Sequence, residues 1–440
     1  MRNKFVIQVF YTNINLNSAG TEKFINNQIV ELNNQDIDAI ILFPVRKIIF
    51  GVSLDYWGIM LNGKNLQILN TDEIVKELSI MSTENKQLIG VMIHHLQNVN
   101  ISKLQKILSS IRKCPILFYL HDFYTACVQY NLLRNDLKFC GSAEIEKEKC
   151  SNCRYYISSI ESKERLRNLF STIENDYLFF IAPSNYVLNT WIKAYPEYVE
   201  KIHVIGHLEF RGEYSLNKEL LNDNDQLNIA YVGASRYTKG WTYWLDAVNA
   251  IDLSFHNYHL YKFGNKEPVS NKMTIVPVSI QKDGADAMIN ALRKNNIHVA
   301  VLNSICPETY SYTFYECLAS NVFIITNKDS GNIQAQVRAF QNGIVLDSPI
   351  ELSDILENEL KLRSLINDYQ MSTHKIPAYY ASNNHYFDYL LATSSLWFSA
   401  KEKSRVPIFR VGCFFVTILY NIRYWNKKQF ASFLFHHIVK

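Results

Sequence analysis

Glycine and proline are scarce in this sequence of 440 residues, which contains 15 Gly and 10 Pro. This composition excludes a collagen-like or low-complexity chain, and no repeat of long period is visible. No apolar run approaches the roughly 20 residues that a membrane-spanning helix needs, so we expect none. The apolar stretch Phe5–Phe10 is short, contains Gln8 and ends without a small-residue cleavage site, so we expect no signal peptide and a cytoplasmic chain.

Hydrophobic residues are plentiful at 48%, and charged residues make up 20%. A chain of this length and composition can bury large cores and is expected to form two domains. It has eight Cys, and without an export signal we expect these thiols to be reduced.

Acidic residues are absent from the C-terminal end, where the segment from Lys403 onward carries seven Lys or Arg. The whole chain has a net charge of +4, so the residues before Lys403 have a net charge of −3. This distribution argues against nucleic acid as a partner of the main body. The tail, residues 405–440, mixes basic and aromatic residues. Two interpretations stay open: a segment lying on an anionic membrane surface, or a helical hairpin packed on the body.

Short apolar runs alternate with amphipathic segments along most of the chain, which predicts an α/β protein with doubly wound parallel sheets. We predict an N-terminal Rossmann-like domain over residues 1–206, containing a Cys-rich loop at 121–156. A second Rossmann-like domain is predicted over 207–385. A crossover helix and the basic tail fill 386–440. The polar stretch from His207 to Gln226 is interpreted as the linker. No GxGxxG dinucleotide motif occurs.

The segment from Pro307 to Gly331 is the most informative part of the sequence. An apolar strand precedes it, and Ser311 or Thr313 can start a helix that ends near Ser320. Glu308 would lie in the loop and Glu316 in the helix, both at the carboxyl edge of the sheet where α/β proteins bind ligands. A helix N-terminus suits a phosphate, whereas carboxylates suit sugar hydroxyls, so the pattern indicates a nucleotide-sugar. Alternatively, both carboxylates are solvated charges at a helix end.

A second loop with suitable chemistry follows the predicted strand Leu227–Val232. Gly233 permits a tight turn, and Arg236 and Lys239 place two cations above the same sheet edge as Glu308. Fixed cations stabilise the charge of a departing diphosphate. The alternative is a pair of solvated loop cations.

His121 and Asp122 follow another predicted strand, Ile116–Leu120. His121 is either a ligand-contacting residue or a hydrogen-bonded neighbour of a turn capped by Asp122. Four cysteines come next and could hold a structural Zn²⁺ through four thiolates. They could equally be unconnected thiols or a redox-sensitive pair. These cysteines are Cys127, Cys140, Cys150 and Cys153.

The Pro307–Gly331 segment and the Lys239-Gly-Trp turn resemble the donor site of retaining GT-B glycosyltransferases, family 4. The resemblance covers roughly residues 110–350 and includes the strand–Pro183-Ser184–helix step. It implies two Rossmann-like domains facing a central cleft, with a C-terminal helical extension. The domain 1–206 would then be on the acceptor side, and the domain 207–385 would bind the nucleotide-sugar. Arg236 departs from the family pattern, in which the Arg more often stands further before the Lys.

The resemblance also implies roles for individual residues. Glu316 would hold the ribose, and Glu308 the transferred sugar. Lys239 and Arg236 would neutralise the diphosphate, and His121 would lie beside the reacting sugar. His121, Glu308 and Lys239 are thus the expected catalytic residues. The expected donor-binding residues are Gly233, Arg236, Lys239, Glu308, Tyr310, Ser311, Tyr312 and Glu316.

The family transfers sugars with retention and usually without a catalytic metal, so we expect no catalytic cofactor. The implied partners are a nucleotide-sugar donor and a glycan or lipid-linked acceptor in surface polysaccharide synthesis. Two alternatives stay open. The chain could be a non-catalytic relative acting as a scaffold or binding subunit, or another Rossmann enzyme that modifies sugar nucleotides; the missing GxGxxG argues against the latter.

Overall fold

The structure is a computed structural model that describes residues 1–16, 19–49, 52–214, 220–264, 271–372, 376–390 and 397. The tail 405–440, with both of its predicted roles, lies outside these residues. Among the helices that the structure describes, none combines the length and apolarity needed to cross a membrane. The chain forms two compact units. Unit 1 contains Met1–Tyr119, Glu164–Ile181 and the chain from Asn384, and unit 2 contains Leu120–Lys163 and Ala182–Asn383.

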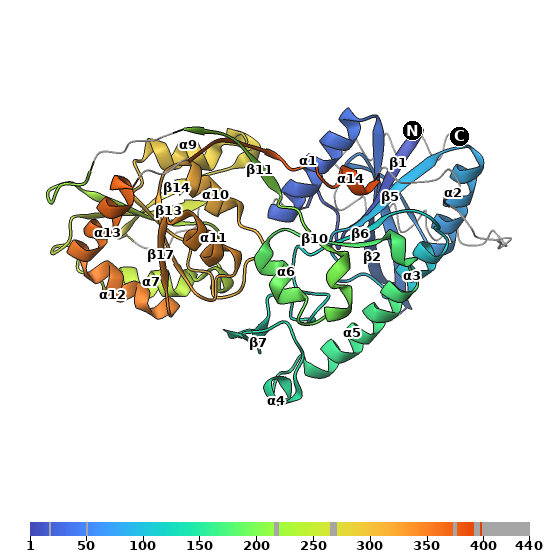
Figure 1. The fold of residues 1–440 in the computed structure, drawn as a ribbon, viewed down its shortest axis with the longest axis horizontal. Coiled ribbons are helices and arrows are strands. Elements are labelled where there is room, and N and C mark those ends of the chain that lie inside the picture. The colour runs from blue at the N-terminus through green and yellow to red at the C-terminus, as the bar shows by residue number, and fades with distance from the viewer. Residues whose placement is uncertain are drawn as a thin grey trace. The chain divides into compact units, whose positions relative to one another are not determined.

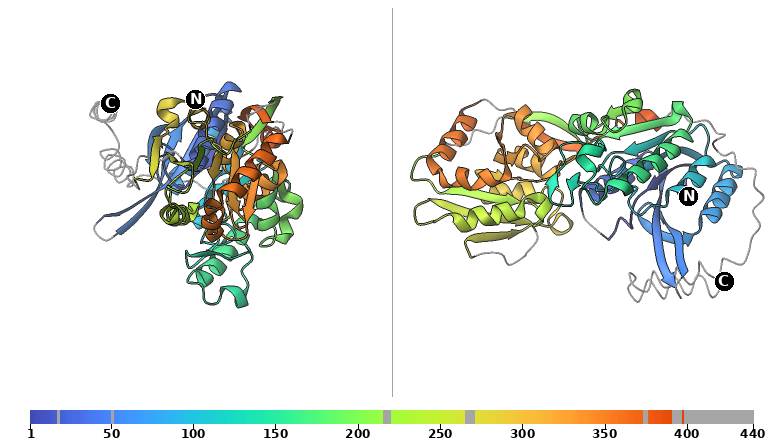
Figure 2. Two further views of the ribbon diagram at one scale, coloured as in Figure 1. Left: turned by 90° about the vertical axis from the view of Figure 1, so that its left-hand side faces the viewer. Right: turned by 90° about the horizontal axis from the view of Figure 1, so that it is seen from below.

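The strands of unit 1 form a mixed sheet in the order β9-β6-β5-β1-β2-β3-β4. The strands from β9 to β2 pair in parallel, whereas β2, β3 and β4 form antiparallel hairpins. Figure 2 shows β2 and β3 running side by side as long strands. The bounds are β1 Lys4–Val9, β2 Ile37–Ile49, β3 Val52–Leu61, β4 Lys64–Leu69, β5 Gln87–Ile93, β6 Ile116–Tyr119 and β9 Leu178–Ala182. The short strand β10 (Ile202–Val204) is counted with unit 2.

Local sequence signals account for the turns and helix starts of unit 1. Asn62 and Gly63 have φ values of 50° and 78°, and this Asn-Gly pair forms the hairpin turn between β3 and β4. Helix α2 begins with a capping box, in which Asn70 and Glu73 bond each other's backbone N–H groups. The helices are α1 Gly20–Asn34, α2 Thr71–Thr83, α3 Ile101–Ser109, α5 Tyr156–Ser171, η1 Asn175–Tyr177 and α14 Phe387–Leu390. Helix α5 begins in unit 2 and ends in unit 1.

The end of the described chain belongs to unit 1. Tyr389 packs against Phe179 with a ring distance of 5.2 Å. The Trp397 indole donates to the carbonyl of Lys86 at 2.8 Å and packs edge-on against Phe5. Residues far apart in the sequence thus complete one core.

Unit 2 contains a six-stranded sheet, all parallel, in the order β14-β13-β12-β15-β16-β17 (Figure 1). Strand β14, the third of these six strands along the chain, lies at one edge of the sheet. The strand order reverses between β12 and β15, which is the doubly wound pattern. The predicted α/β class with parallel sheets is confirmed. The bounds are β12 Leu227–Val232, β13 Tyr258–Gly264, β14 Met273–Pro277, β15 Val299–Val301, β16 Phe323–Asn327 and β17 Gly343–Leu346.

Both faces of this sheet are buried. On one face Trp244, Leu356 and Ile366 pack against alternate strand residues, and on the other Leu292 and Phe314 do so. Burial on two faces explains why the strands are apolar throughout. The helices are η3 Tyr237–Lys239, α7 Trp241–Ala250, α8 Ile280–Asp283, α9 Ala287–Lys294, α10 Tyr312–Ala319, α11 Asn332–Phe340, η4 Pro349–Glu351, α12 Leu352–Glu357 and α13 Glu359–Met371.

The stretch predicted as a linker contains a strand, which corrects that interpretation. Strand β11 (Leu208–Tyr214) pairs antiparallel with β18 (Ile376–Ser382). Phe210 packs against Tyr315 and Tyr380, with ring distances of 5.3 and 5.1 Å. The partner strand lies more than 150 residues away in the sequence, so the polar composition of this stretch gave no sign of it.

The remaining elements of unit 2 lie in residues 120–163 and 182–201. The Cys-rich segment forms only a short hairpin and one helical turn before α5. These elements are β7 Leu133–Arg134, β8 Lys138–Phe139, α4 Lys147–Cys150, α6 Asn185–Trp191 and η2 Pro196–Lys201.

Candidate functional site

The candidate site lies at the carboxyl ends of β12 and β15, where the strand order of unit 2 reverses. Chains leaving two such strands go to opposite faces of the sheet, and the crevice between them is where open α/β sheets bind ligands. The loop after β12 carries Lys239, and the loop after β15 carries Glu308. Both predicted loops are therefore brought to one place.

The loop after β12 is fixed against its neighbour by close backbone packing. Gly240 has a φ of 77°, and a Cβ atom there would lie 1.9 Å from the carbonyl oxygen of Asn303. The amide of Ile305 donates to the carbonyl of Thr238 at 3.1 Å. The hydroxyl of Tyr231 lies 3.1 Å from the carbonyl oxygen of Lys239. The Lys-Gly turn is thus held directly above β15.

Lys239 and Glu308 form an ion pair, with 2.5 Å between Nζ and Oε1. The same carboxylate oxygen accepts from the Ser304 hydroxyl at 3.0 Å. The side chain of Glu308 is 12% exposed and that of Lys239 is 41% exposed, so the lysine is the more exposed member of the pair.

The electrostatics keep this cation charged. Burial acts to lower the pKa of Lys239, but the adjacent Glu308 carboxylate raises it above its ordinary value. Beneath the pair, burial raises the pKa of the Cys306 thiol to about 12, with Glu308 adding to the effect. Cys306 is therefore a neutral thiol at physiological pH and not a nucleophile.

Hydrogen bonds of the Glu308 backbone fix the position of this residue. Its amide donates to the carbonyl of Ser330 at 3.2 Å, and its carbonyl accepts from the amide of Asn332 at 2.8 Å. Beneath it, the buried amide of Asn327 donates to Asn303 Oδ1 at 2.6 Å and to the Ser304 carbonyl at 2.8 Å. This network sets the height of the carboxylate above the sheet.

Gly331 is packed against the backbone of Glu308, and we predict that a side chain at position 331 strongly destabilises the protein. Its φ is 66°, and a Cβ atom would lie 2.5 Å from the amide nitrogen of Glu308. Gly331→Ala should lower the free energy of unfolding by about 2–4 kcal/mol, through strain and the backbone clash. The control is Gly284→Ala, with φ 89° but open space around the new Cβ; it should cost about 1–2 kcal/mol. Equal losses in urea unfolding would contradict the role of the clash.

Helix α10 begins as predicted. Ser311 is its N-cap, and its hydroxyl accepts from the amide of Phe314 at 3.3 Å. Glu316 is half-buried one turn further on, and its charge helps to raise the pKa of Tyr312, after the larger effect of burial. Glu316 and Tyr312 therefore lie on the same side of the helix.

His121 lies close to the Glu308 loop, although 188 residues separate it from Thr309. The Thr309 hydroxyl donates to the carbonyl of His121 at 2.6 Å, and the Ser184 hydroxyl donates to the carbonyl of Thr309 at 2.9 Å. Asp122 caps a turn by accepting from the amide of Tyr124 at 2.9 Å, as one of the two interpretations of His121 expected. The contact of His121 with a ligand stays a prediction. Residues Thr309 and Ser184 were not predicted as part of the site, because this contact is tertiary.

His207 is a buried residue of the site that sequence reasoning missed. Its ring lies 5.1 Å from that of His121 and 4.4 Å from that of Tyr310. The Tyr310 hydroxyl accepts from the amide of Leu208 at 3.2 Å. Tyr310 therefore packs within an aromatic cluster beside the Glu308 loop, and its donor contact stays a prediction. Burial lowers the pKa of His207 to about 3.

This histidine predicts a pH-dependent stability. The unfolded imidazole has a pKa near 6.5, so as the pH falls below that value the unfolded state takes up a proton that the folded state refuses. The stabilisation is complete above pH 6.5 and is lost progressively toward pH 3. When the pH is lowered from 7 to 5, the free energy of unfolding of wild type should fall by about 2 kcal/mol more than that of His207→Gln, as measured by urea unfolding. His385→Gln, at an exposed imidazole, is the control. Parallel losses in all three proteins would contradict this prediction.

The other predicted cation, Arg236, is exposed and starts the 3₁₀ turn that ends at Lys239. Gly233 has a φ of 132° and leaves open space around it. Both residues border the loop after β12, as the sequence predicts for a loop that lets backbone approach a ligand.

Unit 1 has its own reversal of strand order, between β1 and β5. At the carboxyl ends of these strands, the rings of Tyr11 and His95 lie 5.4 Å apart. The Tyr11 hydroxyl donates to the buried Glu22 carboxylate at 3.3 Å. This polar group was not predicted, because each member follows an ordinary strand or helix signal.

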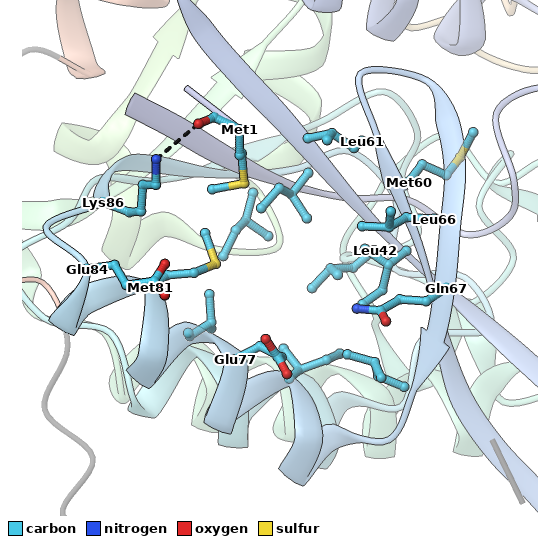
Figure 3. A pocket seen from close by; sticks show the side chains of 16 residues that line it. Met1, Leu42, Met60, Leu61, Leu66, Gln67, Glu77, Met81, Glu84 and Lys86 are labelled. Carbon is cyan, nitrogen blue, oxygen red and sulfur yellow. Dashed lines mark hydrogen bonds between the residues drawn. The ribbon is translucent and has the colours of Figure 1, made fainter. Parts of the chain in front are cut away.

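Unit 1 also contains a cavity of about 260 Å³ between β2, β3, β4 and helix α2 (Figure 3). Its wall is mainly aliphatic and includes Leu42, Met60 and Met81. At its rim, Lys86 donates to the carbonyl of Met1 at 3.0 Å. A mainly aliphatic wall with a lysine and two glutamates, Glu77 and Glu84, does not suit the two phosphates of a nucleotide-sugar, so we do not assign the donor to this cavity.

The comparisons with solved structures concern the fold. Sucrose-phosphate synthase from Thermosynechococcus elongatus matches with a TM-score of 0.51 and 9% identity, over 84% of this chain and 92% of that one. WaaG, a glycosyltransferase involved in lipopolysaccharide biosynthesis, matches with a TM-score of 0.50 and 10% identity, over 83% and 93%. The chain has the GT-B fold. No protein-family model matches the sequence, and no curated protein matches it significantly. The GT-B fold predicted from the sequence is confirmed, and the site described above belongs to its Rossmann-like unit 2.

Proposed function

We propose that this GT-B protein is a glycosyltransferase that moves a sugar from a nucleotide-sugar donor to a glycan or lipid-linked acceptor. The observation that carries the proposal is the Lys239–Glu308 pair at 2.5 Å, at the strand-order reversal of unit 2. A cation and a carboxylate placed together there suit a ligand whose phosphates and hydroxyls are adjacent. Surface polysaccharide synthesis is the setting that we infer from the family resemblance.

In this proposal the leaving diphosphate is bound by Lys239, by Arg236 and by the amides at the start of α10. Its bond to the anomeric carbon breaks, and charge builds on the phosphate oxygen and on the sugar ring. Glu308 and His121 would hold the oxocarbenium-like sugar. The hydrogen bond from Thr309 to the His121 carbonyl, which connects their two loops, supports this assignment. Glu316 is left to bind the ribose.

We further propose retention of anomeric configuration, as in family 4, without a catalytic metal. The acceptor hydroxyl would attack from the side that the diphosphate leaves, and its proton would pass to the departing phosphate oxygen. The fixed cations supply the stabilisation that a metal ion gives elsewhere.

A screen of UDP-, GDP- and dTDP-sugars by thermal shift tests the donor. At about 100 times its dissociation constant, the correct class should raise the Tm of wild type by about 2–4 °C. Glu316→Ala should lose this shift, because the ribose contact is gone. Glu357→Ala, an exposed glutamate on α12, should keep it.

Two results would count against the proposal. If no nucleotide shifts wild type, the donor site does not exist. If a nucleotide-sugar binds but is never turned over, even with a panel of acceptors, the chain is a binding relative of the enzymes.

A further inference from the structure

The cavity of unit 1 lies between one side of helix α2 and the strands that this helix covers (Figure 3). Ile74, Leu78 and Met81 line it, and their spacing of four and then three residues places them on one face of the helix. On the side of the sheet it is lined by Leu42 and Met60, which are buried. Helix and sheet therefore meet through aliphatic and methionine side chains, which are flexible and adapt to an occupant of irregular shape.

The cavity is large enough for a side chain and has an apolar opening. Its volume of about 260 Å³ is larger than the roughly 150 Å³ of an engineered apolar cavity that binds benzene. Leu66 on β4 and Met81 on α2 point into it from opposite sides (Figure 3). Leu66 is 54% exposed. Because apolar surface is stabilised when it is removed from water, an apolar occupant suits this cavity.

The described chain ends beside the same cavity. Lys86 lines the cavity, and its carbonyl accepts from the indole of Trp397 at 2.8 Å. The carbonyl of Trp397 accepts from the amide of Arg112 at 2.7 Å, and its ring lies 5.6 Å from that of Phe5. Trp397 is completely buried. Residues 398–440 therefore continue from a fixed point next to the cavity.

These residues include a segment that needs apolar surroundings. The run 411–420 contains Phe414 and Phe415 and has no charged residue. It is too short to span a membrane, which takes roughly 20 residues. Residues 398–410 can extend over about 40 Å, so the run can reach the cavity from Trp397. Being part of the same chain, it is present at a high effective concentration, and a weak contact is enough to hold it.

Charge also favours this segment over other occupants. The residues that line the cavity include two exposed glutamates, Glu77 and Glu84, and one lysine, Lys86. The chain from Lys403 onward has seven Lys or Arg and no Asp or Glu. Surface ion pairs contribute little to stability, but complementary charge selects one partner over another.

We propose that the run 411–420 docks into the cavity between α2 and the strands β2, β3 and β4 of its own chain. Phe414 or Phe415 is the side chain that enters it. Of the two interpretations of the basic tail, docking corresponds to packing on the body and not to a membrane surface. The proposal concerns unit 1 alone and does not depend on sugar transfer.

Disulfide trapping in the full chain tests the docking, because the run contains a native cysteine, Cys413. Under mild oxidation Leu66→Cys should form a disulfide with Cys413 within the same chain, identified by peptide mass mapping. Val30→Cys is the matched control, at a residue of α1 that is 56% exposed. It should form at least about tenfold less of the disulfide with Cys413, since only docking brings the two thiols within bonding distance.

Thermal unfolding gives a second measurement that needs no new cysteine. If the run covers Leu66, Leu66→Ser should lower the Tm of wild type by about 2–4 °C, whereas Val30→Ser should change it by less than about 1 °C. In a chain that already carries Phe414→Ser and Phe415→Ser, Leu66→Ser should no longer lower the Tm, because the contact it removes is absent.

Three results would overturn the proposal. The first is equal trapping in Leu66→Cys and Val30→Cys, with Tm losses that simply add. The second is a disulfide from Cys413 to another molecule, which would show that the run binds a second copy of the chain. The third is protection of Cys413 from alkylation only after vesicles of equal parts phosphatidylcholine and phosphatidylglycerol are added, which would assign the run to a membrane.

Discussion

Lys239→Met should reduce kcat/KM for sugar transfer by about 10²–10³-fold, the loss that follows removal of one fixed group from a developing anion. Met preserves the length of the side chain, so the change removes charge and little volume. The adjacent Glu308 carboxylate raises the pKa of Lys239 above its ordinary value, so the lysine is already a cation before the donor binds.

A matched variant separates this effect from a general loss of positive charge. Lys361→Met removes an exposed lysine on α13 in the same unit and should leave kcat/KM unchanged. Lys239→Arg should recover only part of the activity, because a planar guanidinium does not fit the position of a compact ammonium. Full activity in Lys239→Met would show that the diphosphate is held elsewhere.

Local signals along the chain were enough to predict the elements that build the site. The apolar runs at 227–232 and 322–326 correspond to β12 and β16, and Ser311 caps α10. These elements are specified by residues within a few positions, through periodicity and capping. The position of the two loops above neighbouring strands then follows from the rules for parallel sheets.

Contacts between distant segments account for what could not be predicted. Strand β11 exists because β18 pairs with it, and no signal inside 207–226 reveals a partner so far along the chain. Thr309 and His207 became visible only when the structure placed them beside His121. The residues around Glu308 are enough to predict a hydroxyl-binding carboxylate. Its ion pair with Lys239 could not be predicted in this way, because the pair joins two loops that are distant in the sequence.

Glu308→Gln should lower kcat about 10²–10³-fold, and it should also destabilise the protein. Gln keeps the shape of the side chain, so it isolates the charge. Without the carboxylate, Lys239 loses its counter-ion. Because the side chain of Lys239 is 41% exposed, water screens part of this loss, and the free energy of unfolding should fall by about 1 kcal/mol.

The double variant Lys239→Met/Glu308→Gln distinguishes the two roles of the pair. In urea unfolding its loss should be smaller than the sum of the two single losses by about 1 kcal/mol, since the second change removes a charge that the first has left without its partner. In turnover no such recovery is expected, because each group acts on a different part of the donor in the transition state. A stability loss equal to the sum would mean that the short Nζ–Oε1 contact contributes nothing. Recovered turnover would mean that the only task of Glu308 is to neutralise Lys239, and its proposed contact with the sugar would then be wrong.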